Sequence, residues 1–166
     1  MSDVKMGVLF VCLGNICRSP TAEGVFLKLI SNDGTPLRAC VLVDSAGVSD
    51  WHAGDPPDPR SLAEAHRHGV DLSGQRSRVV SASDFEEFEY IVSMDRSVLR
   101  ALQSMCPKQF RDRLYLFTDF APETKAPEVP DPYEGGAKGF AQVYHLIEAC
   151  SAGLLKHMEE QAGIRS

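Results

Sequence analysis

The pattern of the first thirty residues leaves little freedom in how this chain can fold. Residues 8–11 are consecutive and apolar, which is typical of a strand buried on both faces of a parallel sheet. Residues 13–15, which include a glycine and an asparagine, break the strand. Ser19 and Pro20 then predict a helix start, with Ser19 as the N-cap and Pro20 at the first helical position. The chain thus opens with a strand, a tight turn and a helix.

The same unit recurs along the rest of the chain. We predict strands at residues 4–12, 40–44, 88–94 and 113–117, and later helices at about 58–68, 96–105 and 138–160. Four prolines between residues 121 and 132 indicate an irregular loop. This alternation predicts an α/β fold, a three-layer sandwich with a four-stranded parallel sheet flanked by helices on both faces. At 166 residues, we expect a single domain spanning 1–166.

Composition excludes several classes of protein. Apolar residues make up 43% of the chain and charged residues 24%, as in a globular domain rather than a disordered or fibrous chain. The formal net charge of −6 argues against nucleic-acid binding and attachment to membranes, and weakly against any anionic ligand. The five cysteines have the spacing of neither a disulfide framework nor a zinc site. Because we find no leader segment and no membrane-spanning apolar run, we expect a cytoplasmic protein.

The turn after the first strand has the composition of a phosphate-binding loop. It begins with Cys12 and continues through Leu13, Gly14, Asn15, Ile16, Cys17, Arg18 and Ser19, a C-x5-R pattern. Between a buried strand and a helix N-terminus, successive backbone N–H groups converge and form an anion nest. Gly14 permits unusual backbone conformations, Asn15 tolerates left-handed geometry, and Arg18 offers a planar fork that matches two phosphate oxygens. We therefore predict that this loop binds phosphate.

The same loop provides a nucleophile. A nest that binds a dianion should also stabilise a thiolate at Cys12, and the Ser19 hydroxyl could donate a hydrogen bond to that sulfur. The chemistry indicated is attack of sulfur on phosphorus, which gives a cysteinyl-phosphate that water later hydrolyses. The leaving group then needs a general acid, and the best candidate is Asp131, because its flanking prolines stiffen the loop.

These residues closely resemble the low-molecular-weight protein tyrosine phosphatases. The resemblance is carried by VCLGNICRSPTAEG at residues 11–24, DSAGVSDWHAGDPPDPR at 44–60, SMDRS at 93–97 and DPY at 131–133. It implies hydrolysis of phosphotyrosine in proteins, and of aryl phosphomonoesters in general, without a metal or a cofactor. It also implies Cys12 as the nucleophile, Arg18 as the phosphate binder and Asp131 as the general acid.

The resemblance further implies that Asn15 and Ser19 shape the loop, and that Trp51 and Tyr133 wall the slot for the phosphotyrosine ring. The partners that follow are phosphotyrosine proteins and phosphate or other oxyanion inhibitors, and we favour a monomer. One residue departs from the family pattern. Gln75 stands where members often carry a histidine that braces the phosphate loop through the asparagine, and glutamine cannot carry charge near neutral pH.

Related activities and one different class stay open. Arsenate reductases of this fold use two more cysteines after the third strand, where this chain has only Cys106. Protein-arginine phosphatases resemble this loop but carry a threonine at the position of Ile16, so Ile16 favours phosphotyrosine. The alternative from another class is a phosphate-sensing domain without catalysis, and the combined presence of Cys12, Arg18 and Asp131 argues against it.

Three residues near these motifs have two interpretations each. Cys17 is either a small apolar filler or the partner in a reversible disulfide that protects Cys12 from over-oxidation, and we hypothesise the redox role. Asp95 follows the third strand and either caps the next helix or orients the site, with capping the more common role. Trp51 is either a packed loop anchor or the rim of an aromatic slot, which we favour.

Overall fold

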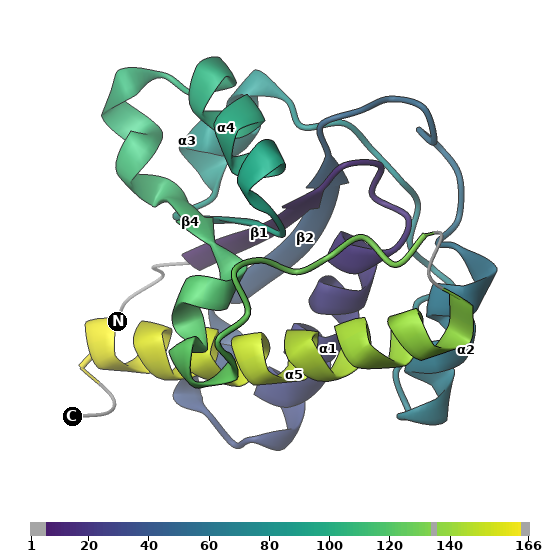
Figure 1. The fold of residues 1–166 in the computed structure, drawn as a ribbon. Helices are drawn as coiled ribbons and strands as arrows, with labels where there is room; N and C mark the ends of the chain where they lie inside the picture. The colour runs from purple at the N-terminus through teal and green to yellow at the C-terminus, as the bar shows by residue number, and fades with distance from the viewer. Residues whose placement is uncertain (1–5, 134–135, 164–166) are drawn as a thin grey trace.

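A four-stranded parallel sheet runs through the middle of the molecule (Figure 1). The computed structural model describes residues 6–133 and 136–163. The strands lie in the order β2-β1-β3-β4, and their bounds are β1 Met6–Cys12, β2 Val41–Gly47, β3 Tyr90–Ser93 and β4 Leu114–Leu116. All three strand pairs are parallel. The predicted α/β sandwich is therefore confirmed.

Helices cover both faces of this sheet. They are α1 (Arg18–Asn32), α2 (Pro59–Arg67), α3 (Ala82–Glu87), α4 (Arg96–Met105) and α5 (Gly136–Gln161). In Figure 1, α1 and α5 lie together on one side of the sheet, and α3 and α4 lie on the other. Within the described residues, no helix combines the length and the apolar character that a membrane span requires.

The central strand β1 divides its side chains between two cores. Val8 and Phe10 pack into the larger core, which contains the apolar residues of α1 and α5. Leu9 and Val11 face the opposite way and pack with Leu102 of α4 in the second core. Each of these β1 residues is completely buried. Consecutive strand residues point to opposite faces, so a strand covered on both sides needs the unbroken apolar run that the sequence has.

Several predicted boundaries differ from the structure by a few residues, and two of these differences affect the loop after β1. The expectation that Ser19 is the N-cap of the first helix is wrong, because α1 begins at Arg18 and Ser19 lies in its first turn with its hydroxyl beside Cys12. The second strand continues to Gly47, beyond the predicted end at residue 44, because its register with β1 runs as far as the pair Cys12 and Gly47. Both differences bring more of the chain to the end of β1.

The strand order places a crevice where β1 and β3 end. From β1 the chain crosses to β2 on one side, whereas from β3 it crosses to β4 on the other. In open parallel sheets, ligands bind at such a switch point, beyond the carboxyl ends of the strands. Here the loop after β1 and the residues after β3 meet at this point.

Candidate active site

The loop between β1 and α1 is held from outside through its carbonyl groups. Its hydrogen bonds run from Val48 N to Cys12 O (3.1 Å), Ser49 N to Leu13 O (2.9 Å), Ser77 Oγ to Gly14 O (2.9 Å) and Asp58 N to Ile16 O (2.8 Å). No peptide bond is cis in residues 6–133 and 136–163, and across a trans peptide the N–H points away from the carbonyl. The N–H groups that follow these carbonyls therefore turn to the inner side of the loop.

The sulfur of Cys12 lies at that inner side. The backbone N–H of Asn15 donates to Cys12 Sγ at 3.2 Å, and Ser19 Oγ lies 3.0 Å from the same sulfur. Asn15 takes a left-handed conformation with φ of 57°, which asparagine tolerates better than most residues. Cys12 is only 2% exposed, so these two contacts of its sulfur are little screened by water. The sulfur of Cys12 is thus enclosed by polar groups of its own loop and of α1.

A buried network of polar side chains supports Asn15 from below. Its Nδ2 donates to Ser19 Oγ at 2.8 Å and to Ser45 Oγ at 3.0 Å, while its Oδ1 accepts from Arg78 N at 3.0 Å. Ser45 Oγ donates in turn to Glu23 Oε1 at 2.6 Å. This network fixes the side chain of Asn15, whose backbone shapes the loop. The sequence predicted only Asn15 and Ser19 as its members, because the other members are far apart in the chain.

Gln75 takes no part in bracing Asn15. Its Nε2 donates to Pro20 O at 3.0 Å, in the first turns of α1. The bracing expected at this position comes instead from Ser45 and Arg78. Burial raises the pKa of Glu23 to about 7, with a smaller contribution from Asp44 in the same direction. The network under the loop therefore ends in a carboxyl group that titrates near neutral pH.

Arg18 is a buried guanidinium with one edge fixed. Nη1 donates to Asp95 Oδ2 at 2.7 Å and to Val129 O at 2.9 Å, and the side chain is 3% exposed. Burial lowers the pKa of Arg18, but the nearby Cys12, Asp95 and Asp131 outweigh it and raise the pKa above its ordinary value. The permanently charged group is thus oriented before any ligand arrives.

Asp95 has both of the functions considered from the sequence. Its Oδ1 accepts from Val98 N at 2.7 Å and caps α4, while its Oδ2 binds Arg18. The two carboxylate oxygens serve separate partners, so capping the helix and orienting the site do not compete. The sequence contained the capping signal, but not the contact with a residue that lies 77 positions earlier.

Asp131 lies across from Arg18 at the edge of the cavity. Its Oδ2 is 3.8 Å from Arg18 Nη2, and its Oδ1 accepts a hydrogen bond from Tyr133 N at 3.0 Å. The Asp131 side chain is 46% exposed, so the carboxyl group is in contact with solvent. Its backbone belongs to the proline-containing segment that was predicted to be irregular.

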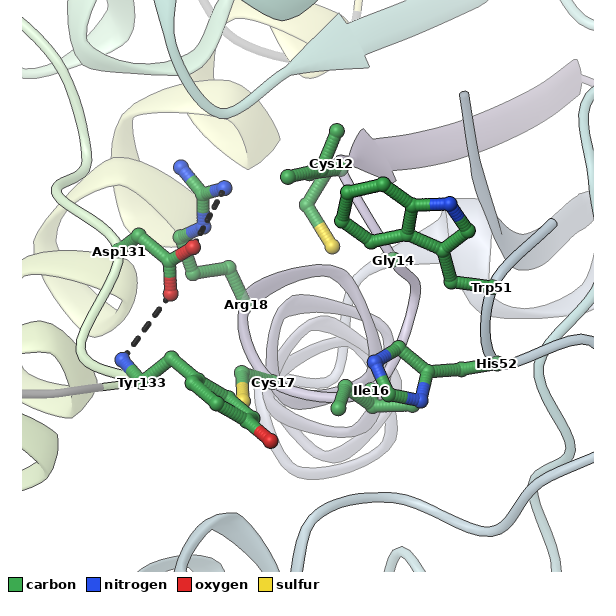
Figure 2. A pocket seen from close by; sticks show the side chains of 10 residues that line it. Cys12, Gly14, Ile16, Cys17, Arg18, Trp51, His52, Asp131 and Tyr133 are labelled. Atoms are coloured by element: carbon green, nitrogen blue, oxygen red, sulfur yellow. Dashed lines mark hydrogen bonds and ion pairs between the residues drawn. The ribbon is translucent and has the colours of Figure 1, made fainter. Parts of the chain in front are cut away.

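These groups surround one open cavity of about 450 Å³ (Figure 2). It is lined by Cys12, Leu13, Gly14, Ile16, Cys17, Arg18, Trp51, His52, Asp131 and Tyr133. Figure 2 shows the Cys12 sulfur between Trp51 on one side and the pair Arg18 and Asp131 on the other. The predicted residues Asn15 and Ser19 are buried and do not line the cavity. His52 was not predicted, and its only signal is its position next to Trp51.

The two aromatic side chains of the rim are exposed. Trp51 is 80% exposed and Tyr133 46%, although both are large and partly apolar. Such residues gain most from burial when a planar apolar group enters between them. Among the described residues, no three His, Cys, Asp or Glu side chains are grouped in a way that could hold a metal ion.

Comparison with known proteins identifies the family. Residues 7–163 match the family model described as low molecular weight phosphotyrosine protein phosphatase. This chain belongs to that family. A phosphatase of this family from Schizosaccharomyces pombe is 41% identical over 149 residues, which cover 90% of this chain and 94% of the relative. The resemblance seen in the sequence motifs is therefore confirmed over almost the whole chain.

Solved structures of this phosphatase fold agree closely. A crystal structure of protein tyrosine phosphatase from Entamoeba histolytica, with Hepes in the active site, matches with a TM-score of 0.91 and 40% identity, covering 95% of this chain and 99% of that one. The Drosophila arginine phosphatase matches with a TM-score of 0.85 and 32% identity, covering 93% and 98%. The fold of this chain is thus shared by solved structures that are named as a tyrosine phosphatase and as an arginine phosphatase.

Proposed function

We propose that this phosphatase hydrolyses phosphotyrosine in proteins in two steps, with Cys12 as nucleophile and Asp131 as general acid. The observation that carries the proposal is the position of the Cys12 sulfur, which accepts from Asn15 N–H at the base of a cavity that also contains Arg18 and Asp131. The inward N–H groups of the loop and the free edge of Arg18 would hold the three non-bridging phosphate oxygens. Trp51 and Tyr133 would enclose the tyrosine ring.

The first step transfers the phosphoryl group to the enzyme. The thiolate of Cys12 attacks phosphorus, a sulfur–phosphorus bond forms, and the bond between phosphorus and the tyrosine oxygen breaks. The Asp131 carboxyl group gives its proton to the departing phenolate. Ser19 Oγ is 3.0 Å from the sulfur. Its hydroxyl can donate a hydrogen bond to the Cys12 thiolate before the attack, and again when the thiolate is released in the second step.

The second step returns the enzyme to its starting state. Asp131, now a carboxylate, accepts a proton from water as the water oxygen attacks phosphorus. The sulfur–phosphorus bond breaks, and Cys12 leaves as a thiolate with inorganic phosphate as the product. Phosphate and oxyanions such as vanadate should therefore inhibit by filling the same loop. We further propose that the protein acts in the cytoplasm as a monomer without cofactor.

Replacing Cys12 tests the proposal directly. The Cys12→Ser variant should lose turnover of p-nitrophenyl phosphate while it still binds vanadate or phosphate. Cys40→Ser is the matched control, because Cys40 lies before β2 and its sulfur bonds Leu37 O, a contact that serine can also make. Turnover that persists in Cys12→Ser would contradict the mechanism. Assays with phosphotyrosine and phosphoarginine peptides on one preparation separate the two phosphatase activities.

A further inference from the structure

The side chain of Arg60, on the first turn of α2, lies between two aromatic rings beside the cavity. Its guanidinium carbon is 5.1 Å from the centre of the Tyr133 ring and 4.6 Å from the centre of the Phe140 ring. Both distances are within the range of cation–π contacts. Tyr133 follows the segment that carries Asp131, whereas Phe140 belongs to α5. Arg60 therefore connects three parts of the chain that are distant in sequence.

Asp58 fixes the guanidinium in this place. Its Oδ1 accepts from Arg60 Nε at 3.1 Å and its Oδ2 accepts from Nη2 at 3.0 Å, a bidentate pair. Oδ1 also accepts from the backbone N of Arg60 at 2.8 Å and so caps α2. The Asp58 side chain is 8% exposed, and its own N–H donates to Ile16 O in the phosphate loop. Arg60 is thus attached, through Asp58, to the loop that holds the nucleophile.

Phe140 strengthens the same attachment. It packs against Ile16 and Cys17 in a small buried cluster beneath the loop. One ring that touches Arg60 is therefore anchored to the phosphate loop, and the other ring, that of Tyr133, is exposed at the rim. The contact with Arg60 links the exposed ring to the anchored one.

The position of Tyr133 determines the orientation of the general acid. The backbone N–H of Tyr133 donates to Asp131 Oδ1, which leaves Oδ2 facing Arg18 (Figure 2). A shift of Tyr133 would move this donor and turn the carboxyl group. Arg60 itself does not line the cavity, and Asp58 already neutralises its charge, so a direct contact with phosphate does not explain its placement.

We propose that Arg60 is a positioning residue that holds Tyr133, and through it Asp131, at a fixed distance from the phosphate loop. This inference rests on the function proposed above, because it assigns Arg60 to the delivery of the Asp131 proton. It predicts that the kinetic effect of losing Arg60 depends on the leaving group. A misplaced acid slows the departure of a poor leaving group, whereas a good leaving group departs without much help from a proton.

The test compares two esters in the variant Arg60→Met, which keeps the length of the side chain and removes its charge and its planar fork. We expect kcat/KM for phenyl phosphate to fall about tenfold, and kcat/KM for p-nitrophenyl phosphate to fall less than about threefold. Arg67→Met is the control, because Arg67 lies on the same helix, is 58% exposed and pairs with Glu64. The control should match the wild type with both esters.

A double-mutant cycle shows whether the effect passes through Asp131. In an Asp131→Asn background there is no acid to position, so adding Arg60→Met should leave kcat/KM for phenyl phosphate unchanged. An equal loss with both esters, or the same tenfold loss in the Asp131→Asn background, would overturn the role of Arg60. A wild type that is inert toward both esters would instead overturn the proposed function, and this inference with it.

Discussion

Arg18 Nη1 lies 2.7 Å from Asp95 Oδ2, and this ion pair joins the first residue of α1 to the N-cap of α4. Arg18 is almost fully buried and Asp95 is 16% exposed. A buried charge that loses its partner is strongly destabilising, so the pair holds the starts of the two helices together as well as orienting the guanidinium. The crevice formed by the strand order is thus closed at its base by an ionic contact.

Asp95→Asn separates this contact from helix capping. Asparagine caps helices as well as aspartate does, but its amide would face the Arg18 guanidinium without charge. We expect kcat/KM for p-nitrophenyl phosphate to fall about 10- to 100-fold, with phosphate binding weakened. Asp95→Ala should show the same loss and lower the free energy of unfolding by about 1 kcal/mol more. Equal activity of Asp95→Asn and wild type would contradict the orienting role.

Asp131→Asn should remove proton delivery while leaving the loop intact. We expect kcat/KM for phenyl phosphate to fall about 10²- to 10⁴-fold, and the inhibition constant for vanadate to change little. Asp119→Asn is the control, since Asp119 is an exposed carboxylate outside the cavity. A parallel loss of vanadate binding would show that Asp131 acts on the phosphate site rather than on the leaving group.

Glu23 should make stability depend on pH. Burial, aided by Asp44, raises the pKa of Glu23 from 4.5 to about 7, against the opposing effects of Ser45 and Arg78. Its contribution is fully present below pH 4.5 and is lost as the pH rises to about 7, a change on the order of 3 kcal/mol. Urea unfolding of Glu23→Gln, which keeps an acceptor for Ser45, should show a gain over wild type at pH 8 that is absent at pH 4.

Glu86→Gln provides the control for this measurement. Glu86 is an exposed residue of α3, so its replacement should leave the pH dependence of the unfolding free energy as it is in the wild type. Wild type and Glu23→Gln with the same pH dependence would show that Glu23 is ionised and solvated in the folded enzyme.

Cys17 should respond to peroxide slowly and in a pH-dependent way. We predict that oxidised Cys12, as a sulfenic acid, is attacked by Cys17 with loss of water, and that added thiol reduces the disulfide. Burial raises the pKa of Cys17 to about 12. Its thiolate fraction, and with it the rate of disulfide formation, should therefore rise about tenfold for each pH unit between 7 and 9. Cys17→Ser should not recover activity when thiol is added after peroxide.

Gly47→Ala should damage the loop without touching any catalytic side chain. A Cβ at Gly47 would lie 2.8 Å from Leu13 O and 3.1 Å from Asn15 N. Backbone atoms cannot move away at a low cost in free energy. We therefore expect the free energy of unfolding to fall by about 1–3 kcal/mol and kcat/KM to fall at least tenfold. Gly74→Ala is the matched control, because a Cβ there would meet no described atom within 4 Å. Both effects can be measured by urea unfolding and p-nitrophenyl phosphate assay.

The sequence predicted the elements that have strong local signals. The unbroken apolar run of β1, the Asp58 cap of α2 and the long apolar period of α5 are all found in the structure. Helix α3 was not among the predicted elements, because six residues are too few to show a helical period. Its capping box, formed by Ser81 and Asp84, was the one signal that could have revealed it.

The chemical groups of the site were predictable, whereas their supports were not. Cys12, Arg18 and Asp131 line one cavity, as their motifs indicated. The residues that hold them, such as Ser45, Arg78 and Asp95, come from distant segments, and even the two that lie in recognised motifs, Ser45 and Asp95, carry no sign of which residue each one contacts. Their roles follow from strand order and register, which only the folded chain reveals. The position of Gln75 shows the same limit, since it bonds Pro20 rather than the loop asparagine.

Three separate stretches of chain hold the carbonyl groups of the phosphate loop, at Val48 and Ser49, at Asp58 and at Ser77. A template held in this way has little conformational entropy left to lose when an oxyanion arrives, so recognition should depend on the shape of the anion. The same arrangement also limits activity toward unintended substrates. Local opening at any of the three stretches would dismantle the template, so a partly unfolded molecule would lose activity rather than act on the wrong phosphoester.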